Sequence, residues 1–170
     1  AHTKSFCHEF GLPVSIADPT PLFAEAIKPL LQTIGYDNAV IYAPDFGSAG
    51  RAIALAEATG TSVVALPKKR TFGDVVEMGF SFDTVAFLKR IRDTYTSSIP
   101  VSCTVSDVAG KIVIIREDEV STGGTAVDTS DQLRAAGARG VFFIATHPVC
   151  TKGWSARFAF YSKRPPFDKV

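Results

Sequence analysis

The sequence predicts an α/β fold with a doubly wound, mostly parallel sheet flanked by helices. Short, nearly continuous apolar runs recur along the chain and form two pairs. Within each pair, a turn and a stretch of helical periodicity lie between the two runs. Strands that are apolar on both faces are typical of a parallel sheet covered by two layers of helices. The composition, 46% hydrophobic and 21% charged residues in a chain of 170, is that of one folded domain.

The first predicted element is a helix that begins near Asp18 and ends near Gly35. Apolar residues spaced by three and four form its expected buried stripe: Leu22, Phe23, Ala26, Ile27, Leu30 and Leu31. Pro29 is expected to bend or interrupt this helix. A β-turn-α-β unit follows, with a strand at 38–44, a turn at 45–50, a helix at 51–60 capped by Gly60, and a strand at 61–67.

The same order returns later in the chain, with a strand at 111–115, a loop at 116–124, a helix at 125–140 and a strand at 141–148. The intervening segment, 68–110, is too long for a simple crossover. Its amphipathic part, 82–95, predicts an inserted helix with mobile flanks and an apolar face of Val85, Leu88, Ile91 and Tyr95. The aromatic and basic tail from Trp154 is expected to form an edge strand or a partner-binding segment.

Charge and cysteine usage limit the function. Eighteen Lys and Arg residues face 17 acids, so the chain is not expected to attract nucleic acid or a membrane surface, and phosphate recognition must be local. No apolar run approaches the roughly 18 residues of a membrane span, and no signal peptide is evident at the start. Cys7, Cys103 and Cys150 form no CxxC pair, which favours core or chance thiols and a cytoplasmic location. Because the chain starts with Ala1, we expect that it was trimmed from, or is part of, a longer one.

The loop after the strand at 111–115 carries the clearest chemical signal. Gly123 and Gly124 allow close approach of a ligand, while Ser121, Thr122 and Thr125 offer hydroxyl donors for a phosphate. The preceding acids would repel phosphate, so they make sense only as acceptors for hydroxyls or as ligands of a metal ion. A phosphorylated sugar carries both kinds of group. The alternative is a solvated strand end followed by a flexible turn.

An aliphatic strand, an acidic pair and TGGT together resemble the phosphoribosyl diphosphate signature of type I phosphoribosyltransferases and phosphoribosyl diphosphate synthetases. The resemblance implies a single phosphoribosyltransferase-like domain over 1–170 with an insertion at about 71–108. It also implies that Glu117 and Asp118 bind the ribose 2- and 3-hydroxyls. The 5-phosphate would be bound by Ser121, Thr122, Gly123, Gly124 and Thr125.

Four further stretches are similar to ribose-phosphate diphosphokinases in the order found there: FGLPVSIADPTPLFAEAIK, APDFGSAGRAIALAEATG, LPKKR and ARGVFFIATHPV. Together the resemblance covers roughly residues 2–149. It implies an enzyme of nucleotide biosynthesis that transfers diphosphate from ATP to ribose 5-phosphate, with Mg²⁺ as cofactor. It further implies a homo-oligomer or a complex with a synthetase subunit.

The same resemblance implies roles for single residues. Lys68 and Arg70 would stabilise the transferring group, and Asp45 would hold Mg²⁺ or its waters. The diphosphate would be bound by Asp45 and by the loop from Gly47 to Gly50, with Gly47 and Ser48 as its first residues. His2 falls on a histidine that helps to bind Mg²⁺ in the family. The alternatives are a solvated basic cluster at 68–70 and a histidine without a role at the chain start. His147 has two alternatives, contact with the nucleotide or capping of a strand.

Three departures from the pattern keep other functions open. Ser48 replaces a second glycine, Arg116 replaces an aliphatic residue and could form an ion pair or face solvent, and Glu119 adds a third acid. The 68–110 segment is similar to the insertion of synthetase-associated proteins, so a non-catalytic regulatory subunit is one alternative. A phosphoribosyltransferase is another, with the tail as the acceptor hood. The N-terminal half of a synthetase has no counterpart in these residues, and without it we expect poor ATP binding.

Overall fold

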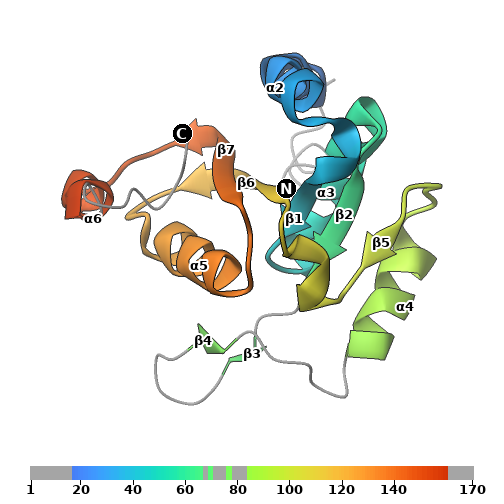
Figure 1. Ribbon diagram of the computed structural model, residues 1–170. Helices are drawn as coiled ribbons and strands as arrows, with labels where there is room; N and C mark the ends of the chain where they lie inside the picture. Colours follow the sequence, from blue (N-terminus) through green and yellow to red (C-terminus); the bar gives the residue numbers. More distant parts are fainter. Residues whose placement is uncertain (1–16, 67–68, 71–75, 78–83, 161–170) are drawn as a thin grey trace, which may run out of the picture.

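The computed structural model describes residues 17–66, 69–70, 76–77 and 84–160 (Figure 1). Its main feature is a five-stranded sheet with parallel neighbours in the order β5-β2-β1-β6-β7. The strands are β1 (Ala39–Ala43), β2 (Ser62–Ala65), β5 (Val101–Ser102), β6 (Ile112–Val120) and β7 (Gly140–Pro148). A separate antiparallel pair consists of β3 (Lys69–Arg70) and β4 (Val76–Glu77). The predicted parallel sheet is confirmed.

Helices cover both faces of the sheet, as a doubly wound fold requires (Figure 1). They are α2 (Thr20–Ile34), α3 (Phe46–Thr59), α4 (Thr84–Thr94), α5 (Gly124–Ala135) and α6 (Trp154–Phe160), with 3-10 turns η1 (Tyr36–Asn38) and η2 (Val105–Val108). Helices α2, α3 and α4 pack on one set of strand residues, which includes Ile41 and Ile114. Helix α5 and η2 pack on the alternate set, which includes Tyr42 and Ile115. Both faces of the sheet are therefore buried.

Helix α2 confirms the first predicted helix, but its buried stripe is narrower than expected. Ile27 and Leu31 are buried, and Phe23 and Leu30 pack beside them. Leu22 is 75% exposed, because at about 100° per residue it lies on the far side of the helix from Ile27. Ala26 is also exposed. Pro29 lies inside α2 and does not interrupt it.

Helix α3 begins five residues earlier than predicted, so the expected turn at 45–50 is wrong. Asp45 is its N-cap: the Asp45 carboxylate accepts from the backbone N–H of Ser48 at 2.8 Å, and the Ser48 hydroxyl bonds the Asp45 backbone. This capping box stabilises a helix that starts directly after β1. The predicted C-cap at Gly60 is confirmed by its left-handed φ of 71°.

Helix α4 confirms the helix expected in the insertion and packs on the first turns of α3. Ile91 is buried and Tyr95 packs against the core, whereas Val85 is 78% exposed, so its predicted place on the apolar face is wrong. An ideally placed Cβ on Gly50 would lie 2.6 Å from Cε1 of Tyr95. The place of the Tyr95 ring, directly after α4, therefore depends on glycine at position 50.

Strand β6 continues through the acids that the sequence placed in a loop. It pairs with β7 from Ile112 opposite Gly140 to Val120 opposite Pro148. The pairing with β1 stops at Ile115, so the rest of β6 and β7 forms a two-stranded extension beyond the sheet. The predicted loop start at 116 is wrong because β7 supplies backbone partners for these polar residues.

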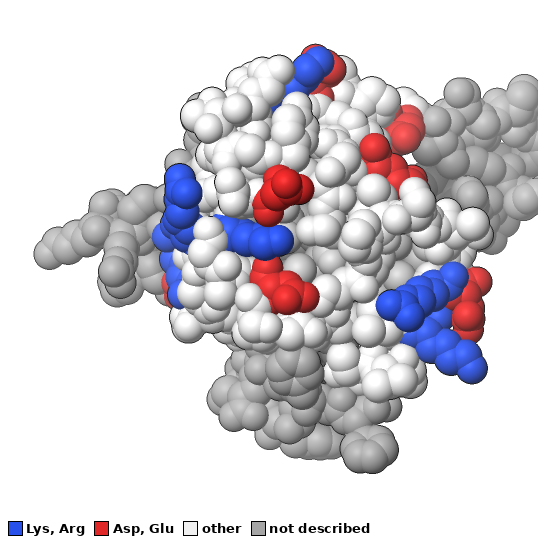
Figure 2. All heavy atoms as spheres, turned by 45° about the vertical axis from the view of Figure 1, so that its right-hand side comes forward, with Lys and Arg blue, Asp and Glu red and all other residues white. Residues whose placement is uncertain are grey.

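The chain after β7 forms a helix where it is described. The expected edge strand is wrong for Trp154–Phe160, which is α6, and the predictions for 161–170 lie outside the described residues. Cys103 is buried, as expected of a core thiol, and Cys7 lies outside the described residues. On the face shown in Figure 2, charged side chains of the described residues lie in small groups, several of which contain both basic and acidic residues. Among the described helices, none combines the length and apolar character needed to cross a membrane.

Candidate functional site

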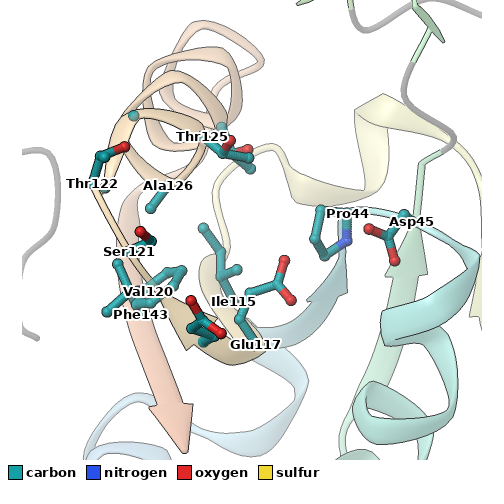
Figure 3. Close-up of a pocket in the computed structure, with 14 residues that line it drawn as sticks. Pro44, Asp45, Ile115, Glu117, Val120, Ser121, Thr122, Thr125, Ala126 and Phe143 are labelled. Carbon is teal, nitrogen blue, oxygen red and sulfur yellow. The ribbon is translucent and has the colours of Figure 1, made fainter. Parts of the chain in front are cut away.

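A pocket of about 350 Å³ lies where β1 and β6 end and α5 begins (Figure 3). Figure 3 shows Pro44 and Asp45 on one side of the pocket and Ser121 and Thr122 on the other. The lining consists of Pro44, Asp45, Ile115, Glu117, Glu119, Val120, Ser121, Thr122, Gly123, Gly124, Thr125, Ala126, Thr129 and Phe143. Ligands of open α/β sheets bind at this edge, where strands end and helices begin. The structure thus brings the predicted residues of two separate segments to one place.

The loop between β6 and α5 has the features of an anion-binding turn. Gly123 precedes α5 with a φ of 78°, a left-handed conformation that favours glycine. The first N–H groups of α5 have no partner within their own helix, and the helix dipole adds positive charge at the same end. The Ser121 hydroxyl is bonded to the hydroxyl of Thr151 at 3.0 Å, whereas Thr122 and Thr125 are exposed.

The acids of β6 reach the pocket in an unexpected combination. Glu117 and Glu119 line it, whereas Asp118 is not among its lining residues. Successive side chains of a strand point to opposite faces, which explains why the first and third acids share the pocket. The Glu117 side chain is 18% exposed and takes part in an ion pair, so the alternative of a solvated strand end is wrong for this residue.

Arg51 of α3 forms ion pairs with Glu117 and Asp118, the two acids predicted to bind the ribose. Its Nη2 lies 3.4 Å from Oε2 of Glu117 and 3.5 Å from Oδ1 of Asp118, and its side chain is 22% exposed. Partial burial makes such a contact stronger than an ion pair in full solvent, which contributes about 0.2–1 kcal/mol. Among the described residues, its buried Nε has no hydrogen-bond partner. Sequence reasoning missed this role, although Arg51 is part of the stretch that resembles the family loop.

Arg116 lies directly beneath the acids and is 2% exposed, so the solvent-facing alternative is wrong. Its guanidinium donates to the backbone carbonyl of Glu117 and, at 3.0 Å, to the hydroxyl of Thr146. Its Cζ lies 4.4 Å from the ring centroid of Phe23 in α2. Burial lowers the pKa of Arg116, and the nearby charge of Arg51 lowers it further, while the acids oppose this. An arginine remains charged at neutral pH, so two cations flank the acids.

Of the residues predicted to bind the diphosphate, one lines the pocket and the others do not. Asp45 lines the pocket, but Gly47 and Ser48 lie in the first turn of α3 and are not among the lining residues. Ser48 is fully buried by its capping role. A Cβ on Gly47 would meet the Asp45 carboxylate at 3.4 Å.

The predicted metal ligands, His2 and Asp45, stay predictions. Within the described residues, no group of three or more His, Cys, Asp or Glu side chains could hold a metal ion. Mg²⁺ usually keeps several waters and uses one or two carboxylates together with substrate phosphates, so a lone Asp45 at the pocket edge still fits. His2, Lys68 and the side chain of Arg70 lie outside the described residues. His147 is exposed on β7, opposite Glu119.

Comparison with known proteins adds a family and a fold. The model of the phosphoribosyl synthetase-associated domain matches residues 35–159. The ribose-phosphate pyrophosphokinase of Ralstonia nicotianae is 29% identical over 150 residues, and that of Pyrococcus furiosus is 36% identical over 114. These alignments cover 88% and 67% of this chain but only 39% and 33% of the relatives. The chain therefore spans well under half of their length.

Two solved structures share the fold. The phosphoribosylpyrophosphate synthetase of Mycobacterium smegmatis matches with a TM-score of 0.63 at 23% identity, over 93% of this chain and 42% of that one. A hypoxanthine phosphoribosyltransferase of Staphylococcus aureus matches with a TM-score of 0.51 at 16% identity, over 85% and 71%. The predicted phosphoribosyltransferase-like fold is confirmed.

Proposed function

Because the chain belongs to the phosphoribosyl synthetase-associated domain family, matched over residues 35–159, we propose that it is the ribose 5-phosphate-binding half of a ribose-phosphate diphosphokinase. The parent enzyme would transfer diphosphate from ATP to ribose 5-phosphate and give 5-phosphoribosyl 1-diphosphate. The observation that supports this most is the pocket, which combines a glycine turn at a helix start with carboxylates at a strand end.

The two ends of the pocket suit the two ends of the sugar phosphate. The N–H groups at the start of α5 and the hydroxyls of Thr122 and Thr125 would donate to the 5-phosphate. Glu117, which can only accept hydrogen bonds when ionised, would bind ribose hydroxyls, with Glu119 on the same face. Arg51 keeps the Glu117 carboxylate in place and offsets part of its charge, so a phosphate can bind nearby.

Catalysis in this proposal comes from positioning and from neutralising charge on phosphate oxygens. Mg²⁺, when bound, would neutralise charge on the diphosphate, and Asp45, which lines the pocket, would hold the ion or its waters. The positive charges of Lys68 and Arg70 would stabilise the negative charge on the transferring group. We also propose that ATP binding and oligomer contacts, either between copies or with a synthetase subunit, involve the longer parent protein, and that it acts in the cytoplasm.

Calorimetric titration of the chain with ribose 5-phosphate tests the binding proposal. We expect Glu117→Gln to weaken binding about tenfold, since one lost charge-assisted hydrogen bond contributes about 1.5 kcal/mol or more. Asp118→Ala and Glu119→Gln, measured in parallel, would show which second acid holds the sugar. Glu57→Gln, which removes an exposed acid of α3, is the matched control. Equal affinity of wild type and all three β6 variants would refute the proposal.

A non-catalytic, synthetase-associated subunit is the second candidate. It is favoured by Ser48, whose buried hydroxyl caps α3 at the position where the synthetase loop has a second glycine. Such a subunit would change the activity of a catalytic synthetase without using its own basic cluster. Wild type and Lys68→Ala should then have equal effects when mixed with a synthetase. A large loss with Lys68→Ala would contradict this candidate.

A further inference from the structure

The start of α5, where the 5-phosphate is proposed to bind, lacks a positively charged side chain among the described lining residues. Among the described residues, the lining includes the carboxylates of Asp45, Glu117 and Glu119 and no Lys or Arg side chain. A phosphate monoester carries about −1.5 to −2 charge at neutral pH. Arg51 and Arg116 lie at the acids, where each already has partners. Within the described part of the chain, a cationic side chain for the phosphate would come from a residue outside the lining.

The chain after β7 returns to the glycine loop and is bonded to it. The backbone N–H of Cys150 donates to the carbonyl of Val120 at 3.0 Å, and that of Thr151 donates to Ser121 at 3.1 Å. The hydroxyls of Ser121 and Thr151 are also bonded, at 3.0 Å. Helix α6 starts three residues later, at Trp154. These contacts fix the start of α6 beside the start of α5.

Arg157 of α6 occupies the space in front of Gly124. An ideally placed Cβ on Gly124 would lie 2.2 Å from Nη1 of Arg157 and 3.8 Å from Oγ1 of Thr122. Gly124 is the first residue of α5 and its φ is not positive, so its backbone does not require glycine. Glycine at this position therefore leaves room for the guanidinium, which would have to move if residue 124 carried a side chain.

Arg157 is exposed, and its guanidinium lies at a helix start, a place that suits an anion better than a second cation. A helix start carries partial positive charge, which repels a cation. Among the described residues, no carboxylate forms an ion pair with Arg157. A phosphate between the N–H groups of α5 and the guanidinium would be attracted by both.

We propose that Arg157 is a phosphate-binding residue of this pocket, which assigns the segment 149–157 to the site. The proposal rests on the proposed function, because it takes the 5-phosphate of the sugar as the anion. The guanidinium donates to phosphate oxygens on the side opposite the α5 N–H groups. Its planar fork allows two parallel hydrogen bonds, which a lysine cannot supply.

Titrations of the 170-residue chain with ribose 5-phosphate, ribose and inorganic phosphate test the proposal. We expect Arg157→Gln to weaken binding of ribose 5-phosphate and of inorganic phosphate about tenfold or more, and to leave binding of ribose unchanged. Arg157→Lys should restore part of the affinity, since it keeps the charge and loses the fork. Arg139→Gln removes an exposed arginine just before β7, at the other end of that strand, and should change nothing.

The outcomes separate this proposal from the one it rests on. If wild type binds ribose 5-phosphate and Arg157→Gln binds it equally well, Arg157 does not contact the phosphate and the proposed function stands. If wild type binds neither ribose 5-phosphate nor phosphate, both proposals fall. An equal loss of affinity for ribose and for ribose 5-phosphate would show a general disturbance of the pocket and would also overturn the assignment. Far-UV circular dichroism checks that each variant is folded.

Discussion

Replacing Arg116 by alanine and by methionine separates packing from charge beneath the acids. Both variants lose the guanidinium and its hydrogen bonds to the Glu117 carbonyl and the Thr146 hydroxyl. Methionine fills most of the space under Phe23, whereas alanine leaves a void at a position that is 2% exposed. The difference in unfolding free energy between the variants therefore measures the void, and we expect about 2–5 kcal/mol.

The methionine variant alone measures the balance of two opposing contributions. Lost hydrogen bonds destabilise the fold, but removal of a buried charge relieves the desolvation that lowers the pKa of Arg116. We expect Arg116→Met to stay within about 2 kcal/mol of wild type. Urea unfolding followed by circular dichroism gives both values, with Arg139→Ala as an exposed control expected within about 0.5 kcal/mol. Equal stabilities of the alanine and methionine variants would refute the packing described for Arg116.

Three further predictions follow from the helix cap, the core and the ion pairs. Ser48→Ala removes a hydroxyl bonded to the Asp45 backbone and should lower the unfolding free energy by about 1 kcal/mol in urea titrations; an unchanged midpoint would contradict the capping role. Burial raises the pKa of Cys103 to about 11 and that of Tyr42 still higher, so both groups favour the folded state below about pH 9. The urea midpoint should then fall as pH rises from 9 to 11, and a flat profile would argue against this burial. Arg51→Gln should weaken ribose 5-phosphate binding about tenfold, or about 1.4 kcal/mol, in calorimetry, and unaltered affinity would show that the acids do not need it.

The parallel sheet was predictable because its signals are local. In the run at 38–44, all five residues of β1 are buried, and in the run at 141–148 the apolar residues Val141 to Ala145 are buried or half-buried. The glycine turn at 123–124 was predictable for the same reason, since a strand, polar donors and a helix follow one another in the sequence. These features need no knowledge of distant contacts.

The features that were missed depend on residues far apart in the sequence. The acids of β6 were expected in a loop, and only the pairing with β7 shows that they continue a strand. Arg116 is buried because Phe23 covers it and Thr146 accepts its hydrogen bond. The start of α3 is a different case. Asp45 and Ser48 had the spacing of a capping box, but the glycines between and after them favoured a turn.

The contact between Gly50 and Tyr95 couples the side-chain sizes at the two positions, because a larger residue at one leaves less room at the other. Since the ring fills the place of a methyl group on residue 50, a related chain with alanine or serine there must carry a smaller side chain at 95, turn the ring aside or hold α4 farther from α3. Sequences of relatives should thus show these positions varying together, with glycine retained wherever the aromatic ring is present.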